Sequence, residues 1–180
     1  MRYYLLDKPE LFDGEVEIIN FYQQLDYRVF SSDRMYQMPS RITFQIRHKE
    51  RIEYPPVLLE PLPLFNKMAW NTIQSFMKKP LHTHFIFIDE KTKDIHHYFC
   101  PSFRRVKCRQ VFGVRQDGMK EVKIYSEEAF PDGLPVLYLD DGNKILVLMR
   151  LDILESLMRK DLCDIRLLPV RIMEEQNYAG

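Results

Sequence analysis

The chain has 180 residues, which suits one domain or one domain with a smaller lobe. Hydrophobic residues make up 46% and aromatic residues 13% of it, a composition that excludes a disordered chain. Lysine plus arginine equals aspartate plus glutamate, 26 each, so net charge creates no general attraction to nucleic acid or to an anionic membrane.

Three cysteines, Cys100, Cys108 and Cys163, form an odd set without the paired spacing of a secreted disulfide framework. The first apolar stretch is too short, and too soon charged, for a signal peptide. No run approaches the ~18 apolar residues of a spanning helix. We therefore expect a cytoplasmic protein with reduced thiols and no membrane association.

The first part of the chain has an uneven pattern, with short strands predicted at residues 3–6 and 16–21. Residues 41–48, RITFQIRH, alternate between apolar and polar side chains, which predicts a strand with one solvated face.

Four prolines between residues 55 and 63 exclude a central strand or a helix throughout that stretch. It is the candidate hinge between residues 1–55, an N-terminal β-rich lobe or sheet extension, and residues 56–180, a main α+β domain. One continuous domain is the alternative.

A helix is predicted at residues 66–78, where Asn66 can act as N-cap and an apolar stripe begins at Ala69 and Ile73. Pro80 ends it. Strands at 84–88 and 95–99 then flank a charged loop and predict a β-hairpin. Two more strands are expected at 105–112 and 121–125, and no internal repeat is visible.

The run from residue 134 to 172 predicts strand, turn, strand, helix and strand. Asp141-Gly142 is typical of a tight hairpin turn, and centring the turn there pairs Tyr138 with Ile145. Both faces of this hairpin are apolar, so it should be interior. Asp152, three residues before Glu155, predicts a capping box for a helix at about 153–160. The expected class is α+β, a mostly antiparallel sheet with two main helices, 66–78 and 153–160.

Histidines at positions 82, 84, 96 and 97, with Cys100 nearby, raise the possibility of a zinc site. Pairing Ile86 with His97 places His82, His84 and His97 on one face of the hairpin and the other two ligands on the opposite face. Four ligands do not converge in that register, so we expect no metal. A metal-dependent enzyme at His82, His84 and His97 stays an alternative.

No nucleophile elbow, P-loop or dinucleotide fingerprint is present. The cysteines lie in strand-like or helix-like contexts, and Cys163 stands among acidic residues that would raise its pKa. Because no nucleophile, base and orienting group occur together, we expect a protein that is not an enzyme, with no catalytic residue and no cofactor.

The segment from Arg104 to Arg115 is a basic stripe. If it is a strand, Arg105, Lys107 and Arg109 project from one face, while Val106 and Cys108 face the core. Such a stripe is either an ordinary solvated face or a binding site for an acidic protein or for phosphates. Aromatic residues flank it but do not interleave with it, which favours an acidic protein over nucleic acid.

Three features give residues 61–172 a family resemblance: the pair Ala69-Trp70, the hairpin FIFIDEKTKDIHHYF, and Arg150-Leu151-Asp152 with Glu155-Ser156 followed by IRLLPV. In these features the chain resembles the eleventh family of bacterial polymorphic-toxin immunity proteins and its relatives. The resemblance implies a cytoplasmic binding protein that neutralises a cognate toxin by direct contact. A nucleic-acid-associated protein that uses the Arg104 to Arg115 stripe is the alternative.

Overall fold

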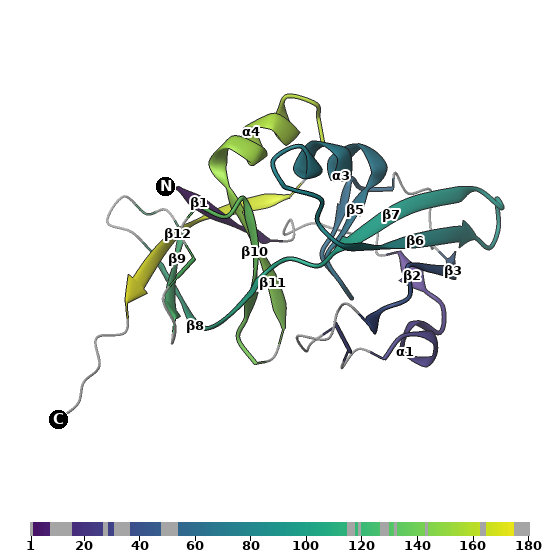
Figure 1. Ribbon diagram of the computed structural model, residues 1–180, viewed down its shortest axis with the longest axis horizontal. Coiled ribbons are helices and arrows are strands. Elements are labelled where there is room, and N and C mark those ends of the chain that lie inside the picture. The colour runs from purple at the N-terminus through teal and green to yellow at the C-terminus, as the bar shows by residue number, and fades with distance from the viewer. Residues whose placement is uncertain are drawn as a thin grey trace.

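Two β-sheets and three short helices make up the described part of this computed structural model (Figure 1). One sheet is a closed six-stranded barrel, and the other is an open six-stranded sheet. The structure describes residues 2–7, 16–26, 29–30, 37–47, 54–114, 118, 120–126, 130–131, 133–142, 144–162 and 165–174.

The barrel combines the N-terminal strand with the five strands of the C-terminal half. Its order is β1 (Tyr3–Asp7), β11 (Ile145–Arg150), β10 (Val136–Asp140), β8 (Arg105–Val114), β9 (Lys120–Ser126) and β12 (Arg166–Glu174), which pairs again with β1. Strand β1 is antiparallel to both of its neighbours. Two pairs, β8 with β10 and β9 with β12, are parallel. These parallel pairs and the placement of β1 close the barrel.

The open sheet is built from the strands between them in the chain. Its order is β2 (Glu17–Ile18), β3 (Arg41–Arg47), β6 (His82–Asp89), β7 (Ile95–Pro101), β5 (Leu64–Asn66) and β4 (Val57–Leu58). Only the β3–β6 pair is parallel. The two edges, β2 and β4, do not pair with each other.

The helices are α1 (Phe21–Gln24), α3 (Lys67–Gln74) and α4 (Leu151–Met158). Helix α3 directly follows β5, and α4 directly follows β11. The two lie side by side across the top of Figure 1, where the Lys160 Nζ donates a hydrogen bond to the Thr72 Oγ1 at 3.0 Å. None of the helices in the described ranges has the length and apolar character needed to cross a membrane.

Two apolar cores follow from this arrangement. The barrel interior is one cluster, filled by side chains such as Leu5, Val106, Ile124 and Leu148. The second cluster lies between the barrel wall, helices α3 and α4 and the inner face of the open sheet, and includes Phe85, Tyr138 and Trp70. Strand β10 serves both cores because its alternate side chains point to opposite faces, and Val136, Leu137, Tyr138 and Leu139 are all at most 1% exposed.

The expected α+β class, a mostly antiparallel sheet with two main helices, is wrong. The protein is mostly β, with a closed barrel and a second, half-barrel sheet. The helices at the predicted places are real but short, eight residues each. The sequence pattern revealed the local hairpins, whereas the long-range parallel pairs that close the barrel leave no local signal.

The two sheets repeat one topology, which the residues alone did not reveal. In chain order the open sheet reads β2, β3, β4, β5, α3, β6 and β7, and the barrel reads β8, β9, β10, β11, α4 and β12. Strand β7 lies between β5 and β6, and β1 takes the corresponding place between β11 and β12. Each pair of neighbouring strands in the open sheet has the same parallel or antiparallel orientation as the corresponding pair in the barrel. The barrel is therefore completed by a strand from the opposite end of the chain.

The C-terminal hairpin has a different register from the predicted one. Tyr138 pairs with Val147 rather than with Ile145, a shift of two residues that keeps each side chain on its expected face. The loop is longer because Asp140 Oδ1 accepts from the Gly142 N–H at 2.9 Å and Asp141 Oδ1 from the Lys144 N–H at 2.9 Å. Gly142 has a φ of 87°, as the predicted turn requires.

The helix caps divide into one confirmed and one wrong prediction. The Asn66 Oδ1 accepts the Ala69 N–H at 2.8 Å, as a side-chain N-cap does. Asp152 lies within the first turn of α4 instead of capping it, and its carboxylate binds the Arg150 guanidinium at 2.7 Å. That contact lowers the pKa of Asp152. A negative charge in the first turn also interacts favourably with the helix dipole.

The first 55 residues contribute to both sheets, since β1 belongs to the barrel and β2 and β3 to the open sheet. The proline-rich stretch carries the short strand β4 and leads into β5. Separate folding of residues 1–55 and 56–180 stays a prediction.

Candidate binding surface

Strand β8 alternates as the sequence predicted. Val106 and Cys108 point into the barrel and are 0% and 9% exposed, whereas Lys107 and Arg109 are exposed on its outer face. The reason is the two-residue period of a strand, which places every second side chain on the apolar side. Two of the three predicted partner-binding residues are thus accessible together.

Arg105 departs from this pattern, because its side chain is only 8% exposed. Its guanidinium forms an ion pair with Asp140 at 3.6 Å, donates a hydrogen bond to the Phe30 carbonyl, and lies 5.6 Å from the centre of the Phe30 ring. The expectation that Arg105 projects into solvent is therefore wrong. It connects the barrel wall to the segment before β3 and cannot be reached by a partner from outside.

Neighbouring strands add residues that sequence reasoning did not assign to this surface. Arg109 pairs with Tyr125 of β9, and its guanidinium lies 5.3 Å from the centre of that ring. Lys123 of β9 pairs with Arg171 of β12. We call the outer surface formed by Lys107, Arg109, Glu121, Lys123, Tyr125 and Arg171 the basic face.

The basic face has an excess of positive charge. Its one carboxylate, Glu121, lies 3.5 Å from the Arg171 guanidinium, and Asp140, opposite Lys107 on the neighbouring strand β10, lies 3.6 Å from the Arg105 guanidinium. Within the ranges that the structure describes, the ion pairs of the barrel involve Arg105, Arg150, Arg166 and Arg171, and none involves Lys107, Arg109 or Lys123. Three cations on two adjoining strands are therefore not neutralised by those ion pairs.

The sequence did contain a pattern from which Lys123 and Tyr125 could have been assigned to the basic face. The segment KEVKIY alternates as β8 does, and a hairpin between the two strands aligns their outer faces. Arg104 is exposed just before β8, and Arg115 lies outside the described residues. The contribution of Arg171 had no such signal, because the β9–β12 pair is long-range and parallel.

The histidine hairpin has the predicted register, with Ile86 opposite His97. His84 and His97 contact each other, Nε2 to Nδ1, at 2.9 Å, and the His84 ring stacks on Phe99 with centroids 4.9 Å apart. His82 packs beside Trp70 at 5.3 Å. Across the described ranges, no group of three or more histidine, cysteine or acidic side chains is arranged to hold a metal ion. These histidines instead pack with one another and with aromatic rings.

A buried carboxylate at the end of β6 was not singled out from the sequence. Asp89 is 1% exposed and accepts hydrogen bonds from the Tyr54 hydroxyl at 2.6 Å and from the N–H groups of Lys91 and Thr92 at 2.7 and 2.9 Å. The Tyr54 ring stacks on His96 with centroids 3.5 Å apart. Because its oxygens accept these three bonds, Asp89 stabilises the β6–β7 turn.

The two described thiols, Cys100 and Cys108, are buried. Burial raises the pKa of Cys108 to about 11, with Asp141 and Asp140 adding to the effect, and burial also raises the pKa of Cys100. Both sulfurs stay protonated near neutral pH, a state that is a poor nucleophile. Cys163, the third candidate, lies outside the described residues.

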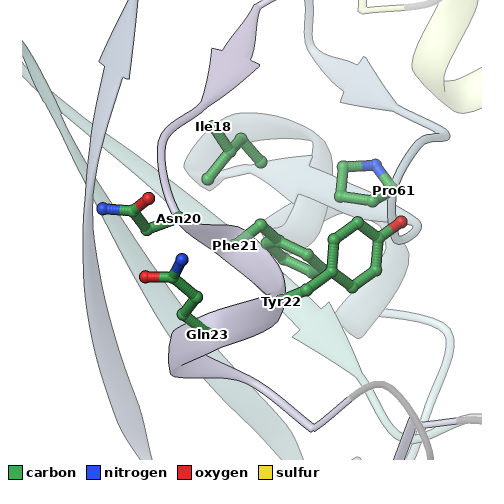
Figure 2. Close-up of a pocket in the computed structure, with 6 residues that line it drawn as sticks. All are labelled: Ile18, Asn20, Phe21, Tyr22, Gln23 and Pro61. Atoms are coloured by element: carbon green, nitrogen blue, oxygen red, sulfur yellow. The ribbon is translucent and has the colours of Figure 1, made fainter.

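A pocket of about 300 Å³ lies between α1, the end of β2 and Pro61 (Figure 2). Phe21 and Tyr22 of α1 meet edge to face at 5.2 Å, Pro61 faces them, and the amides of Asn20 and Gln23 lie on the other side. Ile18 of β2 completes the lining. These groups can pack against an apolar ligand and form hydrogen bonds with it.

Comparison with known proteins finds no family model, no curated protein and no solved structure that matches this chain.

Proposed function

We propose that this protein is a non-enzymatic binding protein that captures an acidic protein partner on the basic face. The observation that carries the proposal is the grouping of Lys107, Arg109 and Lys123 on the outer surface of two paired strands. Such a group of cations attracts an acidic surface, speeds encounter and disfavours basic partners.

A protein partner fits this face better than nucleic acid does. Sequence-tolerant binding of single strands relies on aromatic rings on which bases stack. The aromatic residue of the basic face, Tyr125, has the Arg109 guanidinium at 5.3 Å from its ring centre, so one stacking surface is already in contact with a cation. The balanced charge of the whole chain also provides no broad field for phosphates.

The partner that we propose is a bacterial toxin, with the protein acting as its immunity protein in the cytoplasm. The resemblance of residues 61–172 to immunity proteins supports this partner class. An occluding inhibitor needs a stable scaffold and a charged recognition surface, and this fold offers both. The unpaired thiols of Cys100 and Cys108 suit a reducing compartment.

The test begins by identifying the partner. A photoreactive benzoylphenylalanine is placed at position 107 of the full chain, in cells of the source organism, and the cross-linked protein is identified by mass spectrometry. The triple variant Lys107→Glu, Arg109→Glu, Lys123→Glu is then compared with a control of equal charge change, Lys67→Glu, Lys78→Glu, Lys79→Glu, whose lysines are exposed elsewhere.

We expect the first variant to associate with the cross-linked partner about tenfold more slowly at low salt and to lose its salt dependence. The control should associate within about twofold of wild type, and both melting temperatures should stay nearly unchanged because exposed charges contribute little to folding. Association at the wild-type rate, or capture of mixed RNA and DNA in place of a protein at ~50 mM salt, would refute the proposal.

A further inference from the structure

Strand β8 ends in exposed apolar side chains. Val111, Phe112 and Val114 are 43%, 59% and 70% exposed. Eight large apolar side chains are exposed among the described residues, and three of them lie within residues 111–114. Isolated exposed apolar residues are normal on a protein surface, but a local concentration marks a contact site.

The strand register shows how this concentration is arranged. Val111 pairs with Lys123 and lies on the same side of the sheet as the basic face. Phe112 pairs with Val122, which is 0% exposed in the barrel interior. Val114 pairs with Lys120 on the same side of the strand as Phe112. Apolar side chains therefore occupy both sides of the strand end. We call Val111, Phe112 and Val114 the apolar tip.

None of the three side chains of the apolar tip belongs to the apolar cores of the described residues. The interior cluster includes Cys108 of β8 and Val122 of β9, and Phe112, which lies opposite Val122 in the strand pair, is 59% exposed. Contact of apolar surface with water is unfavourable. A partner that covers these three side chains recovers that free energy without any change in the fold.

We propose that the apolar tip is the anchor of the interface formed by the basic face, and that the acidic partner receives it in an apolar pocket bordered by carboxylates. This inference rests on the proposed function. Charge argues for the occupant: Arg109, Lys120 and Lys123 lie beside the tip on the same two strands. The carboxylate of Glu121, opposite Gly113, lies 3.5 Å from the Arg171 guanidinium. An apolar centre surrounded by charged residues is also the usual arrangement of a protein interface, where a few central side chains dominate affinity.

The anchor and the cations act on different rate constants, which makes the two proposals separable. Charges at the rim of an interface mainly change association and its salt dependence. A buried apolar anchor mainly changes dissociation, and raising the salt concentration does not remove its effect.

The experiment uses the partner cross-linked through position 107 and measures both rate constants by surface plasmon resonance at low and high salt. The test variants are Phe112→Ser and Val114→Ser. The matched controls are Leu81→Ser and Met68→Ser, whose side chains are 67% and 61% exposed at other sites. Melting temperature is recorded for all four.

We expect the two tip variants to dissociate about tenfold faster, at both salt concentrations, with association and melting temperature close to wild type. The controls should stay within about twofold of wild type. If charge reversal slows association and neither tip variant changes dissociation, the anchor is refuted and the proposed function stands. If charge reversal changes nothing, both fall.

Two further measurements test the other occupants of the tip. Co-sedimentation with phosphatidylglycerol vesicles that is lost in Phe112→Ser would overturn the anchor in favour of a membrane contact. Light scattering that finds a dimer in wild type and a monomer in Phe112→Ser would overturn it in favour of a second copy of the chain. No binding to vesicles, together with a monomer, supports the acidic protein.

Discussion

The open sheet and the barrel share one topology and differ in closure. In the barrel, β8 and β10 are ten and five residues long and pair in parallel at Tyr138 and Arg105. The corresponding strands of the open sheet, β2 and β4, have two residues each and do not pair. Prolines at positions 55, 56, 61 and 63 flank β4, and each lacks the N–H that a ladder needs.

Closure decides how the core is divided. The barrel separates an inside from an outside and so has a core of its own, lined by residues such as Leu5 and Leu148. The open sheet has no separate interior, and its inner side chains, Phe44 and Phe85 among them, share one cluster with both helices and the outer wall of the barrel. The same topology thus occurs once with a core of its own, in the barrel, and once with a core shared with other parts of the fold, in the open sheet.

The largest effect should come from the helices that join the two repeats. Ile73 of α3 and Leu157 of α4 are both 0% exposed and belong to the same cluster. We expect Ile73→Ala and Leu157→Ala each to lower the free energy of unfolding by about 2–5 kcal/mol, through lost burial and a cavity. Chemical denaturation measures both. A loss below ~0.5 kcal/mol for either would show that its helix does not belong to the shared core.

A smaller effect should separate the buried arginine of β8 from the exposed one. Arg105→Ala removes the ion-pair partner of Asp140 and the contact with Phe30, so we expect it to cost about 1–3 kcal/mol of stability. The matched change Arg109→Ala, on the exposed part of the same strand, should cost less than ~0.5 kcal/mol. If urea denaturation finds equal losses of stability for the two variants, the contact of Arg105 with Phe30 does not stabilise the fold.

The smallest effect is a pH dependence confined to the open sheet. Burial lowers the pKa of His84 below 6.5, and His97, Arg41 and His82, which face it from β7, β3 and β6, lower it further. Below pH 6.5 the unfolded chain binds a proton that the folded protein resists, so stability falls as the pH drops. His84→Gln should reduce the loss of urea stability between about pH 7 and pH 5.5. An unchanged loss in the variant would contradict this assignment.

The sequence predicted those parts of the candidate surface that depend on the alternation of side chains along a single strand. Alternation in β8 placed Val106 and Cys108 inside and Lys107 and Arg109 outside, as the structure has them. It failed for Arg105, because the burial of that guanidinium depends on Asp140 and Phe30, which come from distant parts of the chain. It also could not include Arg171, which a parallel strand brings to the same face.

Local physics thus determined the elements themselves. The Asn66 cap, the positive φ of Gly142, the alternation of β8 and the register of the histidine hairpin all depend on residues close together in the sequence. Only the tertiary structure decided the architecture. The insertion of β1 between β11 and β12, the parallel pairing of β8 with β10, and the helix pair that joins the sheets each bring together residues far apart in the chain. Such contacts form because they complete a shared apolar core, and an apolar residue carries no record of which distant neighbour will cover it.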